Sequence, residues 1–126
     1  MLENQVVKCL LDTGSSANLL NRKFLSQLSS IQINDTSVQL CGINKTSVQV
    51  YGEAHVNLII GGKVCPLDII IANITSEVIL GIPFITEYCA LVNLKTGLLT
   101  LPEHPPVVVQ INMVQQQLSD YLIVTN

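Results

Sequence analysis

The chain consists largely of short apolar runs rich in Val, Ile and Leu, and a glycine follows most of them. β-Branched residues favour strands, and turn signals recur between the runs at the spacing typical of an all-β barrel or sandwich. The predicted strands cover residues 37–40, 47–51, 54–60, 63–72 and 77–80, with glycines at positions 42, 52, 61, 62 and 81. We therefore expect an all-β fold.

Two short helices are predicted among these strands. Residues 21–28 place Phe24 and Leu25 on one helical face, and Asn21 can cap the start of that helix. A second helix is predicted to begin at Pro83, because proline suits the first turn of a helix.

Composition limits the partners that such a chain can have. Its 126 residues fit one domain, and 48% of them are hydrophobic while only 12% are charged. So few charges leave apolar surface uncovered, and we expect self-association. The formal net charge is -3 and the six Lys and Arg residues are scattered, so a nucleic-acid partner is not expected.

The four cysteines lie far apart and lack the C-x-x-C spacing of zinc sites. Only two histidines could assist them, so a metal site is not expected. We interpret the cysteines as reduced thiols, mostly small core residues, in an intracellular protein. Neither a secretory leader nor a membrane-spanning segment is expected.

An aspartate stands where the first strand-like run, residues 6–11, enters a glycine turn, Asp12-Thr13-Gly14. The strand end is expected to be buried, and Gly14 permits a turn that a Cβ atom would resist. A carboxylate at that point is poised for chemistry. The tripeptide alone nevertheless fits an ordinary turn better, since Asp, Thr and Gly all favour turns.

Two later segments bear on this aspartate. A hairpin tip is predicted around Gly42, although alone it fits an ordinary surface hairpin. Residues 78–81 form an apolar strand that ends in glycine before a helix, which repeats the organisation around Asp12. This repeat hints at internal pseudosymmetry in which only the first unit carries an acid.

Together these motifs resemble a retropepsin-type aspartic protease of retroviruses and LTR retrotransposons. The residues that carry the resemblance are Leu11-Asp12-Thr13-Gly14-Ser15-Ser16, the hairpin around Gly42, and Val78-Ile79-Leu80-Gly81 followed by Pro83-Phe84-Ile85. The match spans about residues 4–101 and ends with a hairpin of residues 90–94 and 98–101. It implies a closed, mainly antiparallel acid-protease barrel with one or two short helices.

The chemistry of this family requires two carboxylates that share one proton and activate a water molecule against a peptide carbonyl. Of the four aspartates, only Asp12 precedes Thr-Gly, so the second carboxylate must come from another copy of the chain. The resemblance thus implies an obligate C2 homodimer that cleaves peptide bonds in a polyprotein without a metal or organic cofactor. Such an enzyme would act in the cytoplasm or within virus-like particles. The alternative is a weak or inactive module that dimerises or binds peptides.

The resemblance also implies roles for the residues after Asp12. Thr13 would bond across the dimer to the partner's backbone, and Gly14 would let the substrate backbone approach. Many retroviral members have alanine where this chain has Ser15. A hydroxyl bonded to the carboxylate would favour its ionised form, so we expect a more acidic working range than a Ser15→Ala variant would show.

Further residues are expected to contact the substrate, which would bind as an extended strand. The flap that closes over the peptide would be formed by Gly42, Ile43, Asn44 and Lys45. Glu77 and Ile79 would line the substrate cleft. Glu77 stands where the family usually has an apolar residue, and it is either an exposed charge or a group that tolerates basic substrate side chains.

Viral relatives often pair an Asp two residues after Gly14 with an Arg just after the later glycine. Ser16 and Ile82 occupy those positions here. Losing both partners avoids a stranded buried charge, but the dimer must then be stabilised by other contacts.

The protease domain is expected to cover residues 1–101, and residues 102–126 form a C-terminal extension. The sequence leaves three interpretations of this extension open. It is a linker towards a downstream polyprotein domain, a dimer-contacting strand around residues 107–109, or a helix around residues 114–122.

Overall fold

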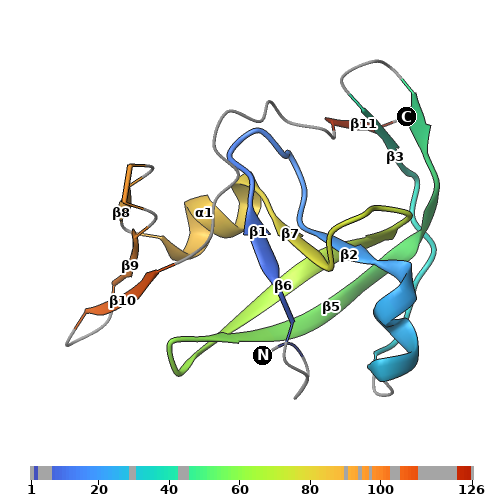
Figure 1. The fold of residues 1–126 in the computed structure, drawn as a ribbon. Coiled ribbons are helices and arrows are strands. Elements are labelled where there is room, and N and C mark those ends of the chain that lie inside the picture. The colour runs from blue at the N-terminus through green and yellow to red at the C-terminus, as the bar shows by residue number, and fades with distance from the viewer. Residues whose placement is uncertain are drawn as a thin grey trace.

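The computed structural model of the chain is mostly β, as the sequence predicts (Figure 1). It describes residues 2, 7–28, 31–42, 46–89, 91–93, 95–96, 98–102, 106–110 and 122–125. The strands are β1 (Cys9–Leu11), β2 (Leu19–Asn21), β3 (Val38–Cys41), β4 (Ser47–Val48), β5 (Val50–Ile60), β6 (Lys63–Ala72), β7 (Val78–Leu80), β8 (Leu91–Asn93), β9 (Leu98–Leu101), β10 (Val107–Gln110) and β11 (Leu122–Thr125). The helices are η1, a 3-10 helix (Arg22–Gln27), and α1, an α-helix (Ile82–Tyr88).

The largest sheet holds five strands in the order β1-β7-β2-β6-β5. Its base is the long antiparallel hairpin of β5 and β6, which pairs as far as Ile60 opposite Lys63. The hairpin turns at Gly61 and Gly62, whose φ angles of 58° and 82° fit a two-residue type I′ turn. These positive φ angles explain why glycines occupy both positions.

Two strand pairs in this sheet are parallel, and one of them positions the candidate site. β1 runs parallel to β7 with Leu11 opposite Leu80, so Asp12 and Gly81 follow their strands at the same edge of the sheet. The second parallel pair is β2 with β6. The other strand pairs are antiparallel, which confirms the prediction of a mainly antiparallel fold.

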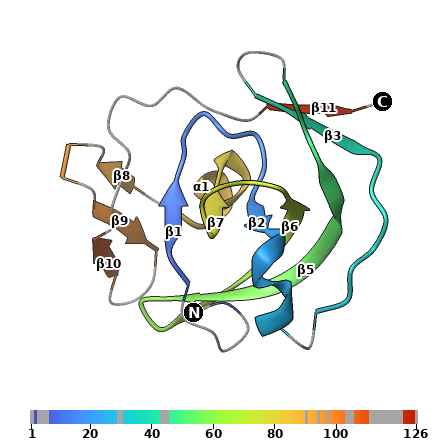
Figure 2. The ribbon, with the colours of Figure 1, turned by 45° about the vertical axis from the view of Figure 1, so that its right-hand side comes forward.

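Two three-stranded sheets, with the orders β10-β9-β8 and β11-β3-β4, flank the largest sheet. They lie on opposite sides of it in both ribbon views (Figures 1 and 2). Within the described ranges no strand pairing closes the three sheets into a barrel, so barrel closure stays a prediction.

The predicted final hairpin is present as β8 and β9. Asn93 Oδ1 accepts hydrogen bonds from the backbone N–H groups of Lys95 (3.0 Å) and Thr96 (3.2 Å), which orders the turn between the strands. The C-terminal extension contributes β10, which pairs with β9, and β11, which pairs with β3. Most of the helix considered for residues 114–122 lies outside the described residues, and Leu122 begins a strand.

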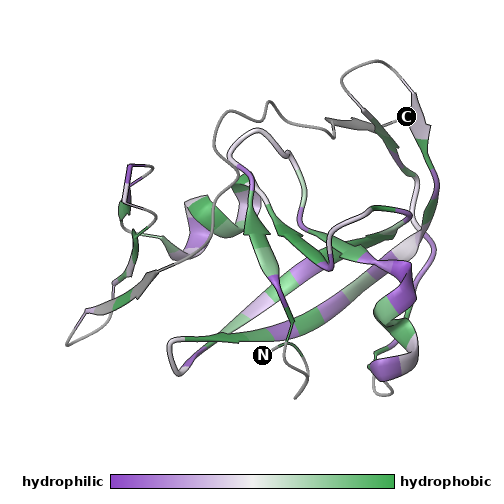
Figure 3. Cartoon of the chain, viewed as in Figure 1, coloured by the Kyte–Doolittle hydropathy of each residue, from purple (hydrophilic) through white to green (hydrophobic). Residues whose placement is uncertain are grey.

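The core consists of two clusters of buried side chains. Hydrophobic and hydrophilic residues alternate along β5 and β6, and the hydrophobic ones contribute to these clusters (Figure 3). The first cluster contains Val56, Leu67 and the fully buried Phe84 of α1. The second contains Leu40 of β3 and Ile79 of β7. The second cluster therefore packs against the β3–β4 hairpin through Leu40, Val38 and Val48.

Both predicted helices are confirmed, although the first is a 3-10 helix. Asn21 caps it as expected, because its side-chain oxygen accepts a hydrogen bond from the N–H of Lys23 at 2.9 Å. Pro83 lies in the first turn of α1. None of the helices in the described part of the chain is long and apolar enough to cross a membrane.

All four cysteines are free thiols. Cys65 is fully buried, while Cys9 and Cys89 are partly buried against the first core cluster. Burial raises the pKa of Cys9 from 9.0 to about 11, and burial does the same for Cys89. These thiols therefore stay protonated in the folded protein at neutral pH.

These two thiols are expected to make folding stability fall between about pH 9 and pH 11. The unfolded chain loses their protons first as the pH rises, because the folded pKa is the higher one, so stability is fully present below pH 9. For Cys9 the separation corresponds to at most about 3 kcal/mol. Urea unfolding across this pH range measures the loss. The Cys9→Ala/Cys89→Ala double variant should lose less stability than the wild type over this pH range. An equal loss in both proteins would assign the pH dependence to other groups.

Candidate active site

The Asp12 loop leaves the end of β1 and is held against β7. The Asp12 backbone N–H donates to the Leu80 carbonyl at 2.9 Å, which extends the parallel pairing by one residue. The carboxylate accepts a hydrogen bond from the Gly14 N–H at 2.9 Å, and the Ser15 N–H donates to the Asp12 carbonyl at 3.1 Å. The carboxylate is half-buried, while Thr13 and Gly14 are exposed. The loop thus presents an oriented carboxylate at the surface.

Ser15 is buried within the loop and bonds to the main chain rather than to the carboxylate. Its hydroxyl donates to the Ala17 carbonyl at 2.8 Å and accepts from the Ala17 N–H at 3.5 Å. The expected hydroxyl-to-carboxylate bond is therefore corrected: Ser15 shapes the loop. The acidic shift of the working range loses its basis, because the hydroxyl is already committed elsewhere.

Gly81 brings the two similar strand-and-glycine units into contact. A Cβ atom on Gly81 would lie 2.4 Å from the Ala17 carbonyl oxygen and 2.5 Å from the Ser15 carbonyl oxygen. The next residue, Ile82, donates its N–H to the Ser15 carbonyl at 2.8 Å. Residues 15–17 therefore pass directly over Gly81, and only a glycine allows this approach.

Asn18 is a further structural residue of the site, and sequence reasoning missed it. It is buried, its Oδ1 accepts from the Gly81 N–H at 3.0 Å, and its Nδ2 donates to the Asp68 carbonyl at 3.3 Å. Its own carbonyl accepts from the Ile70 N–H at 2.9 Å. Asn18 thus ties the Asp12 loop to both β7 and β6. The available signal was a polar residue directly before the apolar Leu19-Leu20 run.

The predicted flap corresponds to the hairpin of β3 and β4, whose register sets Leu40 opposite Val48 and Cys41 opposite Ser47. The Gly42 N–H donates to the Thr46 carbonyl at 2.9 Å, which joins the two sides of the hairpin next to its tip. The other predicted tip residues, Ile43, Asn44 and Lys45, lie outside the described residues.

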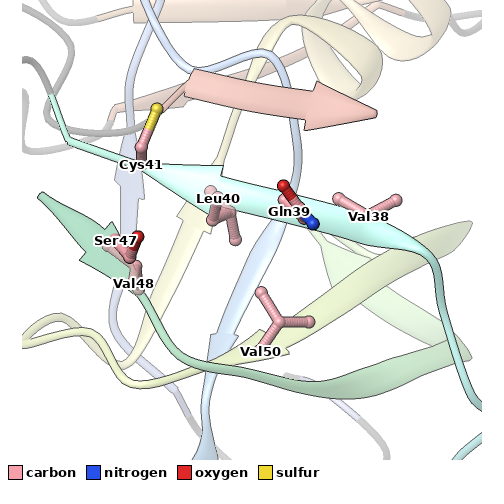
Figure 4. A pocket seen from close by; sticks show the side chains of 7 residues that line it. All are labelled: Val38, Gln39, Leu40, Cys41, Ser47, Val48 and Val50. Carbon is pink, nitrogen blue, oxygen red and sulfur yellow. The ribbon is translucent and has the colours of Figure 1, made fainter. Parts of the chain in front are cut away.

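A hollow of about 490 Å³ runs along this hairpin (Figure 4). It is lined by Val38, Gln39, Leu40, Cys41, Ser47, Val48 and Val50, and its surface is about equally polar and apolar. Such a surface suits an extended peptide, which combines a polar main chain with side chains of either kind.

Ile79 is only 3% exposed and belongs to the second core cluster together with Leu40. It is not among the residues that line the hollow along the hairpin, but it shares its cluster with Leu40, which does line the hollow. The structure therefore brings Ile79 close to the base of the predicted flap as a buried support.

The structure does not bring Glu77 to the Asp12 loop. Glu77 precedes the first residue of β7, whereas Asp12 and Gly81 follow the last residues of β1 and β7, at the other end of this parallel pair. Its carboxylate accepts a hydrogen bond from the Lys8 backbone N–H, and its carbonyl accepts from the Asn21 N–H at 2.9 Å. The Glu77 carboxylate thus has a partner within the chain, and its tolerance for basic substrate side chains stays a prediction.

The positions of the absent Asp–Arg pair are both at the surface. Ser16 is exposed and Ile82 is 41% exposed.

Across the parts of the chain that the structure describes, no group of three or more His, Cys, Asp and Glu side chains is arranged to hold a metal ion.

Comparisons with known proteins give structural matches alone. Neither protein-family models nor curated sequences match the chain. Among solved structures, the protease of EIAV in complex with the inhibitor HBY-793 matches with a TM-score of 0.60 and 19% identity, over 68% of this chain and 80% of that one. The retroviral protease-like domain of Ddi1 from Leishmania major matches with a TM-score of 0.63 and 15% identity, over 92% of this chain and 91% of that domain. The chain therefore has a retropepsin-like fold.

Proposed function

We propose that this chain is one subunit of a homodimeric aspartic endopeptidase that cleaves peptide bonds in a polyprotein inside the cell or within virus-like particles. The observation that carries the proposal is the Asp12 carboxylate, which is oriented by the Gly14 N–H on a loop braced by Gly81 and Asn18. The fold shared with a retroviral protease supports the same chemistry.

In the proposed mechanism, Asp12 and its symmetry mate hold one water molecule between them. One carboxylate accepts a proton from the water as its oxygen attacks the peptide carbonyl, and the protonated partner donates to the carbonyl oxygen. The tetrahedral intermediate then expels the amine, which takes up the proton that the first carboxylate accepted from the water. One hydroxyl of the intermediate returns its proton to the second carboxylate and becomes the carbonyl of the new carboxylic acid. The exposed Gly14 leaves room for the peptide backbone at this point.

We propose that the second copy covers the outer face of the β10-β9-β8 sheet. Leu91 (62% exposed), Leu98 (37%) and Val108 (58%) carry large apolar side chains at its surface. The register sets Leu91 and Val108 on either side of Thr100, so these side chains share one face. Burying such a face is a strong reason to dimerise, and the low charge content of the chain agrees with it.

Leu91→Lys is expected to raise the dimer dissociation constant at least about tenfold, because the variant must bury a charge in place of an apolar side chain. Sedimentation equilibrium measures the constant. Val64→Lys is the matched control, since Val64 is 52% exposed on β6, outside this face. If both variants weakened the dimer equally, or if neither weakened it, the proposed interface would be contradicted.

Cleavage of a peptide library and of the flanking polyprotein, measured at several pH values for the wild type and for Asp12→Asn, tests the enzyme. Cleavage by the wild type alone supports the proposal. Dimers that bind peptides without cleaving them would favour the inactive binding module, and equal cleavage by both proteins would refute the mechanism.

A further inference from the structure

The C-terminal strand β11 occupies an edge of the predicted flap. β11 pairs antiparallel with β3, with Leu122 opposite Cys41 and Thr125 opposite Val38. β4 takes the other edge of β3, so β3 becomes the central strand of a three-stranded sheet. Figures 1 and 2 show β11 running beside β3, far from the other strand of the extension, β10.

Without β11, the β3 edge would be an open row of backbone N–H and C=O groups. Such edges recruit extended segments, and strand addition is a general mode of peptide recognition. The β3 residues Val38 and Cys41 at the two ends of this pairing also line the hollow of about 490 Å³ (Figure 4). An extended peptide that enters along the flap therefore meets the same strand that β11 already pairs with.

The sequence of β11, Leu-Ile-Val-Thr, is well suited to this place. Three of the four residues are β-branched, and such residues favour strands. The segment is also tethered to the chain, so it competes at an effective concentration on the order of millimolar.

We propose that residues 122–125 are an internal competitor for the flap edge, so that the C-terminal extension restrains the entry of extended peptides. This role rests on the proposed function, because it presumes that an extended peptide is the natural ligand. Release of β11 is expected to lower the KM for a peptide substrate about three- to tenfold with little change in kcat, given the effective concentration of a tethered segment and a weak four-residue pairing.

Two single variants of the full chain, Ile123→Pro and Val124→Pro, test the pairing. Neighbouring residues of a strand direct their N–H groups to opposite sides, so only one of these two N–H groups faces β3. Proline is tolerated on an edge strand where the N–H faces away. One variant should therefore release β11, while the other serves as its matched control.

Hydrogen exchange at the backbone amides of residues 38–41 reads out the pairing without any catalysis. We measure it in the Asp12→Asn background, where self-cleavage cannot interfere. Faster exchange in at least one proline variant, reversed by an added synthetic peptide of residues 119–126, is the expected result. Unchanged exchange in both variants would overturn the proposal.

Peptide hydrolysis then tests competition. A lower KM in the variant with faster exchange supports the competitor role, and an unchanged KM overturns it even though the pairing exists. If no variant and no wild-type protein cleaves peptides, the proposed function fails. In that case the affinity of an extended test peptide for each variant decides the competitor role. This affinity should rise when β11 is released, and an unchanged affinity would contradict the role.

Discussion

Asp12→Asn is expected to lower the kcat for peptide hydrolysis by at least about a thousandfold. An asparagine amide cannot take the proton of the attacking water, and it cannot share one proton with a partner carboxylate. The substitution is nearly isosteric, and the amide oxygen can still accept the hydrogen bond from the Gly14 N–H. We therefore expect an unchanged circular dichroism spectrum and an unchanged dimer constant, which separates lost chemistry from lost structure.

A mixing experiment shows whether two chains share one active site. Consider an equal mixture of wild type and Asp12→Asn that has exchanged subunits, in which only one dimer in four has both Asp12 carboxylates. If a dimer needs both, the mixture should show about one quarter of the activity of pure wild type at the same total protein concentration. Independent sites would leave about one half. The measurement requires total protein well above the dimer dissociation constant and time for exchange. A residual activity of one half would contradict the shared site.

The parts of the fold that follow local rules could be predicted from the sequence. Apolar, β-branched runs between glycines marked β5 and β6, and Asn21 and Pro83 marked the helix starts. Gly52, predicted to separate two strands, lies inside β5 at a shift in register. The similar units that end in Asp12 and Gly81 could be recognised because each combines an apolar strand with a glycine. Their direct contact could not be predicted, because the two strands are about seventy positions apart and no local turn joins them.

The rest depended on contacts between distant residues. The sequence allowed the Ser15 hydroxyl to donate either to the Asp12 carboxylate or to the main chain, and the local turn directs it to the Ala17 carbonyl. Asn18 is buried because three segments converge on it, and no local pattern reports such convergence. The pairing of β11 with β3 joins residues about eighty positions apart, so strand propensity alone could not select the partner.

Gly81→Ala is expected to destabilise the fold by about 3 kcal/mol or more, which lies at the upper end for overpacking. The φ angle of Gly81 is -101°, which any residue adopts, so the whole effect comes from contact. The new methyl group would lie 2.4 Å and 2.5 Å from two backbone carbonyl oxygens, and main chain cannot move aside as a flexible side chain can. For a chain of 126 residues this loss corresponds to a fall in Tm of about 10 °C or more.

Gly62→Ala is the matched control, because Gly62 has a positive φ and an open Cβ position, whereas Gly81 has an ordinary φ and a crowded one. Gly62 has a φ of 82°, and a Cβ atom there meets nothing within 4 Å, so this variant suffers backbone strain of only about 1–2 kcal/mol without a clash. Calorimetric unfolding of both variants compares the two effects directly. In the part of the Gly81→Ala population that stays folded, the displaced residues 15–17 should also shift the Asp12 loop and lower kcat, whereas Gly62→Ala should keep wild-type kcat. If both variants lost the same stability, the close approach between the two loops would not be what requires glycine at position 81.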